Sequence, residues 1–303
     1  MHYIAILPAI FTLASAHGVV LSVEGANGVS MPGLSIADGT PRDCSSNRCG
    51  SQADTSIIRD REIRSGEASA LGRTQGNGPV DASVMISNFL GAGNGAASVP
   101  TNNGTNAGVG VEDDLRDLPQ NRQNRIKREK RQLRNLFGGL FGGGGQGQGE
   151  KTETTEETSV AATAGEGSTS GLPTASDNGE VTMTYRQINQ DGAGPMTADI
   201  DATSGGTDPD AFQTAEVTKD VPGLGIQGLS LATNTEFPLT IKMPQGMTCE
   251  GKVGGASNVC IVRVRNGAAA GPFGGSGAFT QSTAARKRAI AFRLKKRMQI
   301  VRN

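Results

Sequence analysis

The chain has 303 residues, of which 35% are apolar, 44 are glycine and none is tryptophan. This apolar content is low for the length and the glycines indicate many turns, so part of the chain cannot belong to a core. The 29 basic and 29 acidic residues balance, but eight basic residues lie between Arg116 and Arg134 and eight more between Arg286 and Arg302. The remaining body is acidic, which excludes nucleic-acid binding by the body because phosphates require Lys and Arg.

The first 16 residues have the pattern of a signal peptide. An apolar run at 4–13 is followed by Ala14-Ser15-Ala16, the small-x-small pattern after which signal peptidase cuts. We therefore expect a secreted protein whose mature chain begins at His17. No later apolar segment approaches the ~20 residues of a membrane span, so we also predict no transmembrane segment.

The cysteines and one sequon agree with export. Cys44, Cys49, Cys249 and Cys260 form an even set, which predicts two disulfides in an exported protein. We favour Cys44 with Cys49 and Cys249 with Cys260, because each pair closes a short loop, although the sequence leaves cross-pairing open. Asn103 stands in an Asn-Gly-Thr sequon and is the predicted glycosylation site.

Short segments with polar residues at alternate positions predict strands. They are 19–24, 181–186, 196–202, 237–242 and 260–265. With frequent Gly and Pro turns between them, they predict a mainly β fold, a single antiparallel β-sandwich of immunoglobulin-like type with long loops.

Two further segments leave alternatives open. Residues 56–67 mix Arg with Asp and Glu and fit either a short exposed helix or a solvated charged loop. Residues 81–90 fit either a strand or a short helix.

The composition changes abruptly over residues 112–177, from a basic run to Gly and Gln and then to Thr, Glu and Ser. Such a segment buries too little apolar surface to offset its ordering entropy, so we predict a disordered insertion within the domain that spans 17–285. The pairs Lys127-Arg128 and Lys130-Arg131 suit a dibasic processing protease. The alternative is an exposed basic loop that survives uncut.

Residues 286–303 form a basic tail. Ile290, Leu294, Met298 and Val301 fall on one face at helical spacing, and eight Lys and Arg residues accompany them without an acidic residue. This pattern predicts a basic amphipathic helix that can touch anionic surfaces. The alternative is a frayed tail that touches nothing.

Several motifs carry a family resemblance. They are His17-Gly18-Val19-Val20, Gly25-Ala26-Asn27-Gly28, Pro32-Gly33-Leu34, Asp38-Gly39-Thr40-Pro41-Arg42-Asp43-Cys44, Gln187-Ile188-Asn189-Gln190-Asp191-Gly192-Ala193-Gly194-Pro195 and Gly271-Pro272-Phe273-Gly274-Gly275. With them the chain resembles the appressorial virulence-factor family, the Gas/Mas-like secreted proteins of pathogenic fungi. The resemblance implies a role in host penetration and does not imply a particular reaction.

His17 supports a second, more distant resemblance. Lytic polysaccharide monooxygenases are also secreted sandwiches that begin on a histidine, which binds copper together with a second histidine. Here His2 is removed with the signal, so His17 is the only histidine of the mature chain. Asp191 or Tyr185 is the candidate oxygen ligand, which would give a weaker site than two imidazoles. The alternative is that His17 is a structural start to the first strand.

Two functions follow as expectations. We favour a non-catalytic secreted virulence protein that binds cell-wall polysaccharide or a host surface component, with retention inside the appressorium as the alternative location. The second is a copper-dependent protein that acts on a cell-wall polysaccharide. With a single histidine and with all four cysteines assigned to disulfides, the mature chain has little scope for a Ser-His or Cys-His nucleophile pair.

Overall fold

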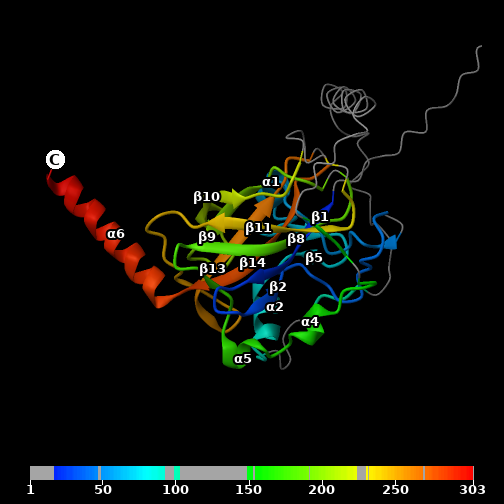
Figure 1. Ribbon diagram of the computed structural model, residues 1–303, viewed down its shortest axis with the longest axis horizontal. Coiled ribbons are helices and arrows are strands. Elements are labelled where there is room, and N and C mark those ends of the chain that lie inside the picture. Colours follow the sequence, from blue (N-terminus) through cyan, green and yellow to red (C-terminus); the bar gives the residue numbers. More distant parts are fainter. Residues whose placement is uncertain are drawn as a thin grey trace, which may run out of the picture.

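The computed structural model describes residues 17–46, 49–92, 99–102, 149–152, 154–190, 192–223, 230, 232–268 and 270–302. These residues are mainly β, and their strands join in one 14-stranded sheet (Figure 1). The strands are β1 (Gly18–Glu24), β2 (Ser30–Pro32), β3 (Ser56–Ile57), β4 (Arg73–Thr74), β5 (Gly78–Pro79), β6 (Glu150–Lys151), β7 (Thr174–Ala175), β8 (Glu180–Gln187), β9 (Thr197–Asp201), β10 (Phe212–Lys219), β11 (Thr235–Lys242), β12 (Gly251–Val253), β13 (Ala256–Arg265) and β14 (Phe273–Gln281). The helices are α1 (Asp60–Ser65), α2 (Ala82–Phe89), α4 (Ser159–Ala162), α5 (Gly167–Ser170) and α6 (Thr283–Arg302), with a 3₁₀ turn at Pro209–Ala211.

The strand order of the sheet is β2-β1-β8-β11-β10-β9-β13-β14-β3-β4-β5, and β6, β7 and β12 pair with β11, β14 and β13. All strand pairs in the described residues are antiparallel except that of β7 with β14. The predicted mainly β, antiparallel class is confirmed. The immunoglobulin-like detail is not confirmed, because β10 pairs with both β11 and β9 and so joins the two halves into one sheet.

The two halves of the sheet enclose the main core. It takes Val20 and Val23 from β1, Met183 from β8 and Leu239 from β11, together with Val262 of β13. Burying these side chains is the main favourable contribution to folding. The period-two pattern of the sequence holds on the inner face of β8, β11 and β13, whereas in β1 a register shift between Val20 and Ser22 brings Val20 and Val23 to the same face.

Glycines of β14 let β1 approach closely. A Cβ atom on Gly275 would lie 2.9 Å from the Cβ of Val20, and one on Gly277 would lie 2.2 Å from a methyl carbon of Val23. Such contacts are too short for any other residue without a backbone shift. The glycine-rich stretch of the sequence is therefore a packing surface for the first strand.

A second core lies on the outer side of β13 and β14. It contains Ile261 and Ala278 from these strands, Leu34 from a loop, and Ile86 and Phe89 from α2. Residues 81–90 are thus a helix, which Asp81 caps by accepting a hydrogen bond from the Ser83 main-chain N–H at 2.8 Å. Both faces of β13 are buried at its centre, which explains why the consecutive residues 259–262 are all apolar.

Within 56–67, residues 56–57 form β3 and residues 60–65 form the short helix α1. The helix alternative is therefore confirmed in part. Its exposure differs from the expectation, because Glu62 is buried and pairs with Arg59 at 2.7 Å and Arg73 at 2.9 Å. Gly66 ends the helix with a φ of 79°, the left-handed conformation that favours glycine.

The predicted insertion 112–177 is wrong in its second half. Within 149–177 the described residues form β6, α4, α5 and β7, and Val160 and Leu172 are buried in the second core. A few apolar residues among Thr, Ser and Glu are enough to order this segment, because the rest of the protein supplies the apolar surface on which they pack. Residues 103–148 lie outside the described part of the chain.

Both favoured disulfides are present. Cys44 bonds to Cys49 across five residues, and Cys249 bonds to Cys260 across eleven. Cys249 and Cys260 are buried in the main core, where they tie the start of β12 to β13. After β14 the chain turns at Ser282 into α6, which extends away from the sheet (Figure 1).

Candidate functional site

Three of the family motifs meet at His17. Its main-chain nitrogen donates to the Asn189 side-chain oxygen at 2.6 Å, and its carbonyl accepts from the Ile188 N–H at 3.0 Å. Its imidazole lies 4.2 Å, centroid to centroid, from the ring of Phe273. The start of β1, the segment 187–195 and the segment 271–275 therefore form one cluster, which we refer to as the His17 cluster.

Burial controls the chemistry of His17. The residue is 1% exposed. Loss of solvent lowers the pKa of its imidazole to about 3, and the charge of Arg59 acts in the same direction. The imidazole is therefore neutral at any physiological pH.

Arg59 is itself fixed by the motif that holds Phe273. Its guanidinium donates to the main-chain oxygens of Ala270 and Gly271, the latter at 3.2 Å, and to Glu62 at 2.7 Å. These contacts anchor α1 to the loop beside His17. They also place a permanent positive charge near the imidazole, which disfavours a bound cation there.

Tyr185 lies in the same cluster as a hydrogen-bond donor. Its hydroxyl donates to the Gly192 carbonyl at 2.9 Å, and burial, with a contribution from Asp220, raises its pKa. A Cβ atom on Gly18 would lie 2.0 Å from this hydroxyl oxygen, so the glycine after His17 makes room for the tyrosine. Tyr185 thus holds the turn after β8 in place.

The residues of the His17 cluster that the structure describes do not fit a copper site. The imidazole packs on Phe273, the Tyr185 hydroxyl donates to a carbonyl, and Asp191 lies outside the described residues. In the described part of the chain, no three His, Cys, Asp or Glu side chains lie close enough together to hold a metal ion. No chemical step is derived through copper.

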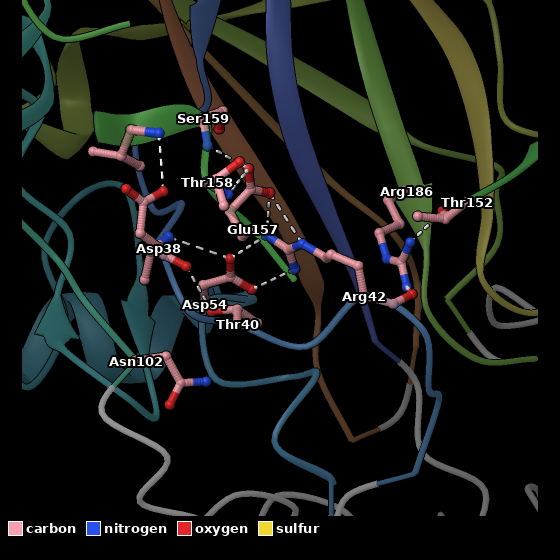
Figure 2. Close-up of polar contacts among 12 residues, drawn as sticks. Asp38, Thr40, Arg42, Asp54, Asn102, Thr152, Glu157, Thr158, Ser159 and Arg186 are labelled. Carbon is pink, nitrogen blue, oxygen red and sulfur yellow. Dashed lines mark hydrogen bonds and ion pairs between the residues drawn. The ribbon is translucent and has the colours of Figure 1, made fainter. Parts of the chain in front are cut away.

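A second cluster, which we refer to as the Arg42 network, is charged and buried (Figure 2). The Arg42 guanidinium donates to both Asp54 oxygens, at 3.1 and 2.6 Å, and to one Glu157 oxygen at 3.0 and 2.8 Å. The Arg42 and Asp54 side chains are 2% and 0% exposed and that of Glu157 is 11% exposed. This arrangement uses four of the five N–H donors of the arginine in charge-assisted hydrogen bonds.

The charges of the Arg42 network support one another. Burial opposes the charged form of Arg42, but Asp54 and Glu157 outweigh it and raise the arginine pKa. Burial likewise acts to raise the pKa of Glu157, yet Arg42 and hydrogen bonds from Ser159 hold it below its ordinary value. Arg42 and Glu157 are therefore both charged at neutral pH.

The segment 38–42 also ties together two distant parts of the chain. The Asp38 carboxylate accepts from the N–H groups of Val160 and Ala161 at 3.0 and 2.8 Å, at the start of α4. The Asp38 carbonyl accepts from the N–H of Asn102 at 2.8 Å. Asn102, directly before the undescribed segment 103–148, and Val160 and Ala161, further along the chain after it, therefore attach to the same residue, Asp38.

Arg186 extends the network toward β11. Its guanidinium donates to the Arg42 carbonyl and to the Thr152 hydroxyl, and to the Asn234 side-chain oxygen at 3.1 Å. Burial lowers its pKa to about 10, and the charge of Arg42 adds to this. Sequence reasoning identified the motif around Arg42 but not the ionic network, since nothing local distinguishes a buried arginine from an exposed one.

The remaining predicted sites stand as follows. The four cysteines form the two disulfides described above. Asn103 and the dibasic pairs lie outside the described residues, as do residues 1–16. None of the helices that the structure describes combines the length and apolar character needed to span a membrane.

The described residues form a mainly β protein that two disulfides cross-link. Its two clusters are buried: the His17 cluster is held by packing and hydrogen bonds, and the Arg42 network by ion pairs. The sequence matches the Egh16-like virulence factor family over residues 15–274, and the chain belongs to this family. It is 51% identical over 282 residues to the "Appressoria-specific virulence factor GAS2" of Pyricularia oryzae, covering 93% of this chain and 89% of the relative. It is 40% identical over 134 residues to "Appressoria-specific virulence factor GAS1" of the same fungus, covering 43% of this chain and 52% of the relative. No solved structure matches it.

Proposed function

We propose that this protein is a secreted virulence factor of the appressorium that acts by binding, without catalysis, at the fungal wall or the host surface. Its full-length relative is named for virulence and for the appressorium. Two disulfides support an oxidising, extracellular destination, because such bonds are rare in the cytosol.

One observation carries the non-catalytic part of the proposal: His17 and Arg42, from two of the family motifs, and the neighbouring Tyr185 are buried. His17, Tyr185 and Arg42 are at most 1% exposed, and the polar contacts described above hold each of them within the protein. A catalytic group must come within about 3 Å of a substrate atom, which such burial prevents. The motifs build the scaffold, and the binding residues lie on the exposed surface.

The binding proposal is tested with the purified, secreted protein. Pull-down with insoluble chitin, β-glucan and cellulose, and with isolated plant epidermal wall, should retain it on at least one of these materials. The same protein after heat denaturation is the control for non-specific adsorption. No retention on any of them would contradict wall binding, and amino-terminal sequencing that finds a start other than His17 would contradict the secretory part.

The copper-dependent alternative is tested through His17. Copper titration of the wild type and of His17→Ala should show only weak, non-stoichiometric uptake that is the same for both. Incubation with chitin or cellulose and a reductant should release no oxidised oligosaccharides. Robust release by the wild type that is lost in His17→Ala would overturn the non-catalytic proposal.

A further inference from the structure

Among the described side chains, the hydrogen bonds and ion pairs between the helix α6 and the body involve its residues up to Arg293. Ser282 caps its start by accepting from the Ala285 N–H at 3.0 Å, and Ala285 is buried. Arg293 donates to the Thr248 hydroxyl at 2.9 Å. A Cβ atom on Gly246 would lie 3.1 Å from the ring of Phe292, so that ring packs over the loop before β12.

The opposite side of α6 carries an apolar strip. Ile290, Leu294 and Met298 are 40%, 53% and 62% exposed. Residues four apart in a helix differ by only about 40° in direction, so these three line up. Ala285 lies about 180° from the centre of this strip, and therefore the strip faces away from the body.

Cations flank the strip. Lys287, Lys295 and Arg297 are exposed, and the sequence contains no acidic residue after Glu250. At about 100° per residue, Arg297 borders one side of the strip and Lys295 the other. Lys287 points in the direction of the strip, one turn before Ile290, and so interrupts the apolar face there. The predicted amphipathic pattern therefore holds for the outer half of α6 and not for its whole length.

We propose that the outer half of α6 binds the surface of an anionic lipid bilayer, lying in the interface with Leu294 and Met298 among the acyl chains. Each basic residue gains attraction to the negative surface, and the apolar strip gains burial that no polyanion in water can offer. This exposed strip is the reason to favour a membrane over a nucleic acid or the acidic body of a second copy. Membrane binding by α6 is proposed in addition to binding at the wall.

The experiment measures binding of the full secreted protein to vesicles by co-sedimentation. Phosphatidylcholine vesicles with about one third phosphatidylserine should bind it, and pure phosphatidylcholine vesicles should not. The variant with Lys287→Glu, Lys295→Glu and Arg297→Glu should lose about a hundredfold in partition coefficient. The matched control reverses three exposed lysines of the body, Lys151, Lys219 and Lys252, and should lose far less.

A second variant separates lipid binding from binding to any polyanion. Leu294→Ser with Met298→Ser keeps every charge, and its binding should fall about tenfold and become sensitive to salt above about 0.15 M. The proposal would be overturned, in favour of a polyanion as the partner, if this variant bound vesicles as well as the wild type does and a short RNA duplex abolished the binding. Equal losses from the α6 and body charge reversals would overturn it as well. So would light scattering that shows a dimer in solution that the α6 reversal dissociates.

Discussion

Removing the charge at the centre of the Arg42 network should destabilise the protein severely. In Arg42→Met the side-chain volume stays similar, but Asp54 remains fully buried and loses both of its charge-assisted hydrogen bonds from arginine. Glu157, at 11% exposure, loses two more. Breaking a buried pair from one side costs about 3 to 5 kcal/mol, a large share of the roughly 5 to 15 kcal/mol by which proteins are stable.

Urea unfolding at neutral pH, followed by circular dichroism, measures this cost. The matched control is Arg61→Met, because Arg61 is 73% exposed and lies 3.6 Å from Glu62. That variant should change the free energy of unfolding by at most about 0.5 kcal/mol. Adding Asp54→Asn to Arg42→Met should restore part of the stability, since the uncompensated buried charge is the main cost. Equal effects of Arg42→Met and Arg61→Met would refute the reasoning.

Three further predictions concern pH, proteolysis and disulfides. The pKa of Glu157 is lowered on folding from an ordinary value of 4.5, so its contribution is present above that pH and is lost as the pH falls below it. Glu157→Gln should therefore destabilise at pH 7, and its difference from the wild type in urea unfolding should shrink at pH 3; a constant difference would contradict this. Trypsin should cut first within 103–148 and leave a nicked protein that elutes as one folded species, because Asn102 before the segment and β6 directly after it are both hydrogen-bonded to the folded body; a first cut within 180–265 would contradict it. Replacing Cys249 and Cys260 by alanine should lower the free energy of unfolding by about 2 to 4 kcal/mol, more than replacing the other cysteine pair, and an equal or smaller loss in thermal melts would argue against it.

The sequence by itself determined the features that depend on near neighbours. Alternation of apolar and polar residues identified β1, β8, β11 and β13, because a strand that covers a core needs every second side chain to be apolar. The even cysteine count and short spacings identified both disulfides. The tail 286–303 is predicted to be helical from the spacing of its apolar residues, a pattern that needs only near neighbours, and α6 begins just before it at Thr283.

Only the tertiary structure decided which polar residues are buried. Arg42 meets Glu157 across 115 residues, and His17 meets Asn189 across 172. A sequence states which side chains are charged, but not which distant segment removes them from water. For that reason residues 149–177 were wrongly predicted to be disordered, and the histidine that looked like a ligand became a buried, neutral part of the core.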